Sequence, residues 1–220
     1  MRWFLISAVL AGVAGTANAD AKAETLTFQS ATYSSLRQVL TNTGPDARVE
    51  VRAALGFSAA ASGRMPAVVL LHSLAGYRDQ NEGWQAAALR EAGFATLTYD
   101  SFAARGMGDL VTDSPRQRPP YPSALADAFA ALAALARDPR IDPERIAILG
   151  FSFGGEVAHD TAFERLRARL GEGQQRFAAH VAYYPAGVYG VVAAANAYTC
   201  APILMMVGGN DTLPVAKAES

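Results

Sequence analysis

Short apolar runs and amphipathic stretches follow one another along the chain, and this alternation predicts strands and helices in turn. Residues 67–71 and 146–149 carry only apolar side chains, which is typical of strands buried on both faces of a parallel sheet. Residues 48–55 alternate between apolar and polar side chains, so we expect a strand with one wetter face near a sheet edge. Further strands are expected at residues 25–28, 94–99, 178–184 and 203–207.

Apolar side chains at helical spacing predict three helices between these strands. The first spans residues 84–92, with Trp84 and Leu89 on its apolar face and Gly93 at its end. The second begins at an N-cap, Ser123, and runs through residue 136. The third follows Ser152 and ends near residue 170, with its arginines on the solvated side. Alternating strands and helices predict an α/β fold, a mostly parallel sheet with helices on both faces.

The clearest chemical signal is the segment 145–155, which reads Arg-Ile-Ala-Ile-Leu-Gly-Phe-Ser-Phe-Gly-Gly. Residues 150–154 fit the pattern Gly-x-Ser-x-Gly, in which the glycines permit a sharp turn from strand to helix that presents the serine hydroxyl. Ser152 is therefore the candidate nucleophile. It would lie at a helix N-terminus, where unpaired N–H groups favour negative charge, and the N–H of Phe153 is a candidate oxyanion donor.

Length and composition narrow the class of protein. The chain has 220 residues, 51% of them hydrophobic, which suits one domain, and we place that domain at residues 20–220. A net charge of -1 without a basic block argues against a nucleic-acid partner. Cys200 is the only cysteine and there are three histidines, so we expect no internal disulfide, no metal and no cofactor. The sequence gives no indication of oligomeric state.

The N-terminus has the three parts of a secretory signal. Arg2 supplies a positive charge, residues 4–15 are apolar, and Ala17-Asn18-Ala19 supplies small residues for cleavage. We therefore predict a signal peptide at residues 1–19 and a periplasmic or secreted protein. The apolar run is shorter than the roughly 20 residues of a membrane span, so no stable membrane anchor is expected.

Several motifs in the same order resemble the dienelactone hydrolase family of the α/β-hydrolase superfamily. They lie at residues 68–72, 77–79, 100–106, 141–155 and 208–214, and the resemblance covers roughly residues 45–220. It implies an α/β-hydrolase fold, with Ser152 as nucleophile and Asp211 as the acid of a catalytic triad. It also implies that Phe153 and the backbone of Ser73 or Leu74 form the oxyanion hole.

Two polar residues at strand ends have alternative roles. His72 either acts as the catalytic base or braces its loop, and bracing is favoured because the triad order in these folds places the histidine last. Asp100 is either catalytic or the cap of a loop, and the cap is favoured. The long Gly- and Pro-containing connection 103–121 predicts a lid or binding loop, and its Arg105 is a candidate contact for an acidic substrate.

This chain departs from the family pattern in two ways. The family places its catalytic histidine after Asp211, and residues 212–220 contain none, so the domain is expected to lack its last strand and helix. Members named for dienelactone hydrolysis often carry cysteine where this chain has Ser152. Our first hypothesis is an exported serine hydrolase that cleaves a small-molecule ester or lactone. The alternative is a catalytically inactive, hydrolase-like protein that binds a small ligand.

Overall fold

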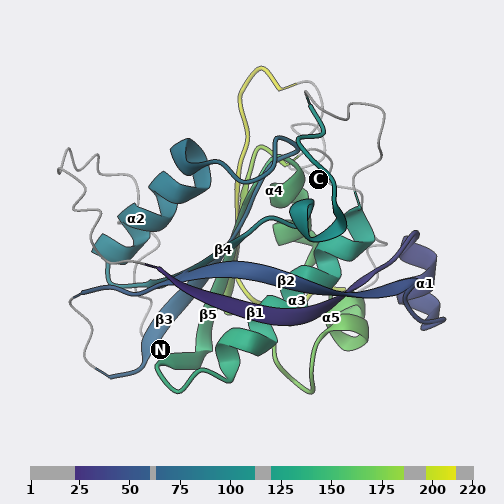
Figure 1. Ribbon diagram of the computed structural model, residues 1–220, viewed down its shortest axis with the longest axis horizontal. Helices are drawn as coiled ribbons and strands as arrows, with labels where there is room; N and C mark the ends of the chain where they lie inside the picture. The colour runs from purple at the N-terminus through teal and green to yellow at the C-terminus, as the bar shows by residue number, and fades with distance from the viewer. Residues whose placement is uncertain (1–22, 60–62, 112–119, 186–196, 212–220) are drawn as a thin grey trace.

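A seven-stranded sheet organises the computed structural model, which describes residues 23–59, 63–111, 120–185 and 197–211 (Figure 1). The strand order is β1-β2-β4-β3-β5-β6-β7. The predicted signal peptide and residues 212–220 lie outside the described residues. The strands are β1 (Glu24–Thr32), β2 (Ala47–Gly56), β3 (Met65–Leu71), β4 (Ala95–Tyr99), β5 (Ile141–Phe151), β6 (Ala179–Tyr183) and β7 (Ile203–Met206).

The sheet is mixed at one end and parallel through the rest. β1 pairs antiparallel with β2, which pairs antiparallel with β4. From β4 through β3, β5 and β6 to β7, every neighbouring pair is parallel. The ends of β3, β5, β6 and β7 therefore meet at one edge of the sheet, which is the edge where open α/β sheets bind ligands.

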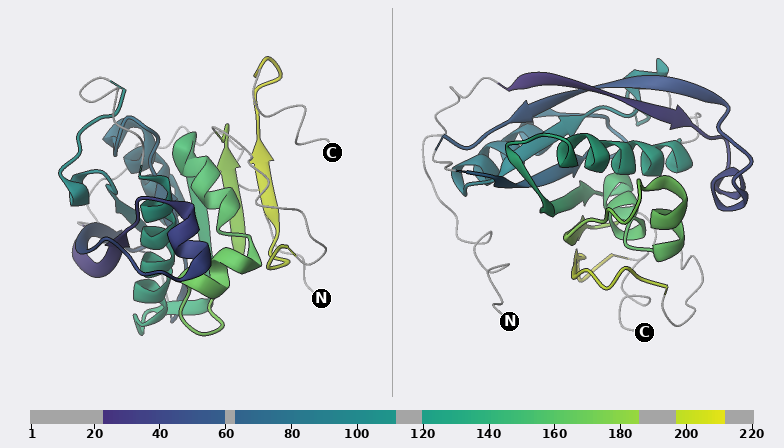
Figure 2. Two further views of the ribbon diagram at one scale, coloured as in Figure 1. Left: turned by 90° about the vertical axis from the view of Figure 1, so that its right-hand side faces the viewer. Right: turned by 90° about the horizontal axis from the view of Figure 1, so that it is seen from below.

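Helices cover both faces of the sheet, as predicted. Figure 1 shows α2 (Trp84–Glu91) on one side and the helices α3 (Tyr121–Ala136), α4 (Phe153–Asp160) and α5 (Glu164–Leu170) on the other. Figure 2 shows the short α1 (Leu36–Thr41) beyond the end of the β1–β2 ribbon. One turn of π-helix (Asp79–Gly83) precedes α2, and a 3-10 turn (Ala103–Arg105) follows β4. None of the described helices is both long and apolar enough to cross a membrane.

The apolar patterns of the sequence correspond to the two cores that flank the sheet. Val69 and Ile148 are fully buried on the side of α3 and α4, whereas Leu70 and Leu149 pack on the side of α2. In β2 the apolar side chains of Val51, Ala53 and Leu55 are buried, and Arg52 and Ala54 between them are exposed. The predicted strand at 48–55 is thus confirmed, and β1 rather than β2 forms the sheet edge.

The predicted helix from Ser152 to residue 170 is wrong in its middle, where it divides into α4 and α5. The N–H of Glu164 donates to Ala197 O at 2.8 Å, and the N–H of Thr199 donates to Ala162 O at 2.8 Å. A segment far along the chain thus replaces helical hydrogen bonds at the break. The prediction that Arg167 is solvated is also wrong, because its side chain is 8% exposed and bonds to Glu164 and to Gly173 O.

Two further predictions about helices, for Ser123 and Trp84, are wrong. Ser123 is not an N-cap; α3 begins at Tyr121, and the buried Ser123 hydroxyl accepts the N–H of Tyr33 at 2.9 Å. Trp84 is 65% exposed rather than on the buried face of α2. Gly93 does follow the helix with a φ of +94°, as a glycine in that position is expected to do.

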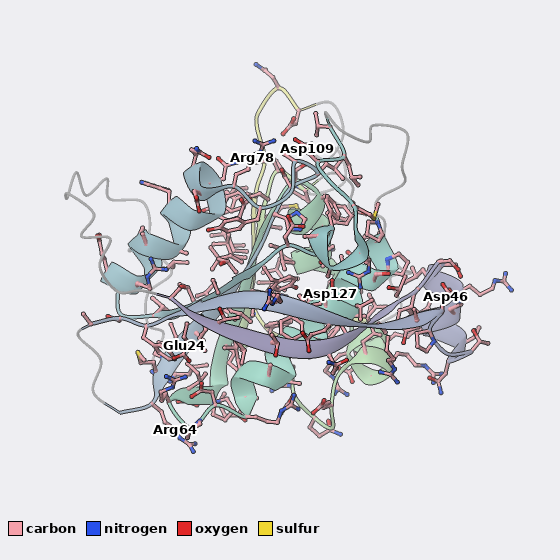
Figure 3. The ribbon with its side chains drawn as sticks, in the orientation of Figure 1. Glu24, Asp46, Arg64, Arg78, Asp109 and Asp127 are labelled. Carbon is pink, nitrogen blue, oxygen red and sulfur yellow. The ribbon has the colours of Figure 1, made fainter. Side chains whose placement is uncertain are left out.

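A buried ion pair joins α3 to the turn after β4. Arg105 Nη1 and Nη2 lie 2.8 and 2.9 Å from the carboxylate oxygens of Asp127, whose side chain is fully buried (Figure 3). The hydroxyls of Ser30 and Ser101 donate to the same carboxylate. Arg105 is therefore committed to the interior, and its predicted contact with an acidic substrate is wrong.

We predict that Asp127→Asn lowers the free energy of unfolding by about 3–5 kcal/mol, because the Arg105 guanidinium would stay buried without its counter-charge. Urea denaturation followed by circular dichroism measures the change. The matched control is Glu172→Gln, which breaks an ion pair with Arg137 on the surface and should cost no more than about 1 kcal/mol. Equal losses in the two variants would contradict the prediction.

Candidate active site

Ser152 lies in a sharp turn between β5 and α4 and has a backbone conformation that side chains rarely adopt. Its φ is +52° and its ψ is -111°. A Cβ atom on Gly150 would lie 2.0 Å from Gly154 O, so only glycine fits at the start of the turn. This is the geometry that the Gly-x-Ser-x-Gly pattern predicts for a nucleophile elbow.

Hydrogen bonds from two other elements hold the elbow in place. The N–H of Ser152 donates to Tyr183 O at the end of β6 at 2.9 Å, and Ser152 O accepts the N–H of Glu156 at 3.0 Å. A Cβ atom on Gly154 would lie 2.6 Å from His72 O, so the start of α4 touches the loop after β3. The serine thus lies between the ends of β3 and β6, and its side chain is partly exposed.

The loop after β3 leaves one backbone N–H, that of Leu74, available near the start of α4. Ser73 O accepts the N–H of Gly76 at 3.2 Å, and Leu74 O accepts the N–H of Leu110 at 3.0 Å. Ser73 and Gly76 form an isolated antiparallel bridge, so the Ser73 N–H faces Gly76 O, whereas no acceptor among the described residues meets the N–H of Leu74. Phe153 is the first residue of α4, where N–H groups lack helical partners. The oxyanion roles of Phe153, Ser73 and Leu74 stay predictions.

His72 is engaged through both ring nitrogens. Its Nδ1–H donates to Ser73 O at 2.7 Å, and its Nε2 accepts the N–H of Ser101 at 3.0 Å. The ring is buried and packs edge-to-face on Phe102. Both ring nitrogens are thus occupied by backbone groups, and neither contacts Ser152. These contacts favour the bracing role over the catalytic one.

Asp100 has the contacts of a loop cap. Its Oδ1 accepts the N–H groups of Phe102 and Ala103 at 2.8 and 2.9 Å, and its Oδ2 accepts the N–H of Tyr77 at 3.4 Å. A second connection joins the same loops, because Arg78 forms an ion pair with Asp109 above the end of the sheet (Figure 3). The loops after β3 and β4 are therefore tied to each other beside the elbow.

Asp211 follows β7 at the same edge of the sheet as Ser152. Its Oδ2 accepts the N–H of Gly208 at 3.1 Å, and its N–H donates to Gly208 O, which closes a tight turn. The carboxylate is exposed, and no histidine contacts it among the described residues. Its role as the triad acid stays a prediction.

The other two histidines are structural. His159 Nδ1–H donates to Asp160 at 2.7 Å, and His180 Nδ1–H donates to Ala158 O at 2.9 Å. Burial lowers the pKa of His180 from 6.5 to about 4, so this ring is neutral at physiological pH. Both rings are buried against the helix layer of α4, away from the edge of the sheet.

A small pocket lies behind the elbow rather than at its serine. Neither Ser152 nor Asp211 belongs to its lining, and no group of three or more metal-ligating side chains occurs in the described part of the chain. The lining is mostly apolar and consists of Leu71, His72, Tyr99, Ser101, Ala124, Phe153, Gly154 and Val157.

The elbow, the loop after β3 and the turn after β7 thus share one edge of an α/β sheet, and the sequence as a whole matches a known family. The model of the dienelactone hydrolase family matches residues 51–219. The chain belongs to this family. None of the curated proteins compared with the sequence matches it.

Solved structures of dienelactone hydrolase-like proteins share the fold. A protein named m3DLH is 25% identical with a TM-score of 0.56, over 74% of this chain and 65% of that one. A dienelactone hydrolase-like promiscuous phosphotriesterase from metagenomic libraries is 19% identical with a TM-score of 0.60, over 90% and 74%. A protein described as a dienelactone hydrolase of Klebsiella pneumoniae is 17% identical with a TM-score of 0.56, over 89% and 78%. The present chain therefore spans 65% of the length of m3DLH.

In this dienelactone hydrolase family member, two buried acids on α4 lie one and two turns beyond the nucleophile elbow. Burial raises the pKa of Glu156 from 4.5 to about 7, and the negative charge of Asp160 makes a smaller contribution to the same shift. Asp160 is fully buried and accepts hydrogen bonds from Tyr121 Oη and His159. The pair of buried acids, Glu156 and Asp160, was not predicted from the sequence. The spacing of Glu156 and Asp160, four residues apart on one helix face, was the signal that could have located it.

We predict that Gly154→Ala lowers the free energy of unfolding by about 1–3 kcal/mol, because its Cβ would overlap His72 O and force the elbow away from the loop after β3. Urea denaturation checks the value. Gly209→Ala is the matched control, since nothing lies within 4 Å of a Cβ there, and it should leave stability nearly unchanged. Equal stability of Gly154→Ala and the parent would show that the close approach is not required.

We predict that Glu156→Gln flattens the dependence of stability on pH. The raised pKa means that the folded chain binds more protons than the unfolded chain between pH 4.5 and about 7, so the parent loses stability as pH rises through that window. Glu156 is partly accessible to solvent, which weakens the effect. Between pH 5 and pH 7 the parent should therefore lose about 1–2 kcal/mol more of its free energy of unfolding than the variant loses. Denaturation at pH 5 and pH 7 measures it.

Both proteins retain His180, whose lowered pKa acts in the opposite direction between pH 4 and 6.5, so the comparison isolates Glu156. The exposed Glu91 supplies the matched control, since Glu91→Gln should follow the parent. The prediction is wrong if the Glu156→Gln and parent curves run parallel.

Proposed function

We propose that this chain is the core of an exported serine hydrolase that cleaves an ester or lactone bond in a small molecule. The observation that carries the proposal is the strained backbone of Ser152, with a φ of +52° in a glycine-flanked turn between β5 and α4. Such strain persists where the surrounding structure enforces it, and it is concentrated at functional sites. Membership of the dienelactone hydrolase family supports the same conclusion.

In the proposed reaction, Ser152 Oγ attacks the carbonyl carbon of the substrate. The carbonyl oxygen gains negative charge, which the N–H of Phe153 and the N–H of Ser73 or Leu74 stabilise. A base takes the serine proton and returns it to the leaving alcohol, and Asp211 orients that base. Water then hydrolyses the acyl-enzyme by the same route.

The base is the part of this mechanism that the described residues do not supply. None of the three histidines contacts Ser152 or Asp211 within the described structure, and His72 has both nitrogens occupied. For the 220-residue chain we therefore expect low turnover. Binding and the oxyanion donors alone leave a residual acceleration of about 10³ to 10⁴ over water.

The same observation supports the second candidate function, binding of a small ligand without turnover. A crevice that retains the elbow and the oxyanion donors but lacks a base would bind carbonyl compounds and release them unchanged. The two functions differ in whether Ser152 reacts covalently.

Serine in place of cysteine at the elbow leads us to propose an ester or lactone other than a dienelactone as the substrate.

We predict that a fluorophosphonate probe labels Ser152 in this protein slowly. The donors that stabilise an oxyanion also stabilise the phosphoryl oxygen of the probe, but the described residues supply no base to take the serine proton. Labelling is read out by gel fluorescence and by mass spectrometry of the modified peptide. Ser152→Ala should lose the label. Cys200→Ala is the matched control, because Cys200 is an exposed free thiol, and it should label like the parent.

Labelling of Ser152→Ala to the parent level would overturn the assignment of the nucleophile. Labelling that is lost in Cys200→Ala and retained in Ser152→Ala would place the reactivity at the thiol. Absence of label in the folded parent would favour the ligand-binding function.

A further inference from the structure

Three aromatic side chains lie at the ends of β5 and β6, directly beside the elbow. Phe151 and Tyr183 are register partners on adjacent parallel strands, and their rings stack with centroids 5.0 Å apart and planes 15° from parallel. The ring of Tyr184 lies 6.3 Å from that of Phe151 at an angle of 45°. We call these three residues the aromatic wall.

The wall is connected to the nucleophile through the backbone. Phe151 immediately precedes Ser152 in the chain, and Tyr183 O accepts the N–H of Ser152 at 2.9 Å. A shift of either strand end would therefore move the serine and the rings together. Substrate held at Ser152 would have the wall as its neighbour on the β6 side.

Tyr184 has a second strained backbone conformation at this edge of the sheet. Its φ is +35°, and its N–H donates to Met206 O on β7 at 2.7 Å. A bulky residue in this region is an outlier that costs on the order of 1–3 kcal/mol. Tyr184 is 48% exposed at the surface beside the elbow.

The charges around the wall favour a neutral occupant. Glu82 is fully buried, and its carboxylate lies close enough to raise the pKa of Tyr184 after the effect of burial, so an anion would be repelled. The arginines in the segments after β3 and β4 are paired with acids, since Arg78 pairs with Asp109 and Arg105 with Asp127. Tyr184 is exposed, whereas the stacked rings of Phe151 and Tyr183 are half-buried and pack against the core on the α2 side of the sheet. Partly accessible rings of this kind suit an uncharged planar group.

We propose that Phe151, Tyr183 and Tyr184 bind a neutral aromatic group of the substrate by stacking, so that the enzyme selects aryl over alkyl esters. This inference rests on the proposed function, because it makes Ser152 the reacting group. The wall is a binding surface and takes part in no proton transfer. An aromatic contact of this kind changes affinity by about 3- to 10-fold.

Binding to a Ser152→Ala protein tests the wall separately from catalysis. Phenyl acetate and cyclohexyl acetate, which have the same carbonyl and a ring of similar size, are titrated by NMR to obtain dissociation constants. We expect phenyl acetate to bind about 3- to 10-fold more tightly. Adding Tyr184→Ala should remove the preference, whereas adding Tyr184→Phe should retain it.

Two further variants separate the ring from the backbone. Tyr184→Gly removes the ring but suits the positive φ, so it should lose the preference while remaining folded. Tyr198→Ala removes another exposed tyrosine, which stacks on Phe163 beside α5, and should keep the preference.

If the Ser152→Ala protein binds the two esters equally and the parent is still labelled at Ser152, the proposal for the aromatic wall is wrong and the proposed function stands. A retained aryl preference without labelling would support the wall and reject the nucleophile. A second copy of the chain is the alternative occupant of the aromatic wall. Sedimentation of the same variants tests it by measuring their oligomeric state. If Tyr184→Ala converts a dimer to a monomer and the esters bind equally, the rings belong to an interface with a second copy.

Discussion

The backbone of Ser152 is the constraint on which the rest of this edge of the sheet depends. A φ of +52° in a serine is unfavourable by on the order of 1–3 kcal/mol, so it persists only because other contacts require it. The Tyr183 carbonyl and the Glu156 N–H supply two of these contacts. Gly150 and Gly154 supply the third, since a Cβ on either would overlap neighbouring backbone. Strand β6, helix α4 and the loop after β3 are therefore positioned by one turn.

Patterns that act over a few residues were sufficient to predict much of the fold. The runs at 67–71 and 146–149 became the two central strands because apolar side chains on both faces suit a buried parallel strand. Ser123 and Arg105 were misassigned because their contacts lie far away in the sequence. The position of the Ser123 side chain depends on its hydrogen bond with Tyr33, and that of Arg105 depends on its ion pair with Asp127. A local sequence pattern does not contain such distant partners.

The candidate site shows the same division between local and long-range information. The elbow was predictable because its five residues are contiguous and its glycines have a steric cause. The role of His72 depended on the N–H of Ser101, which the pairing of β3 with β4 brings near. The pairing of Phe151 with Tyr183 likewise needs the register of β5 and β6, although the Tyr183–Tyr184 pair at a strand end was visible in the sequence.

The arginines near this edge of the sheet form ion pairs within the protein, which leaves them unable to attract a charged substrate. Arg105 neutralises Asp127 in the interior, Arg78 neutralises Asp109, and the net charge of the whole chain is -1. Long-range attraction of a charged substrate is therefore weak, because steering requires a surface potential of one sign. Discrimination must then come from short-range contacts that depend on shape and stacking. Among the described residues, the exposed Tyr184 and the half-buried Phe151 and Tyr183 lie beside Ser152 and can provide such contacts.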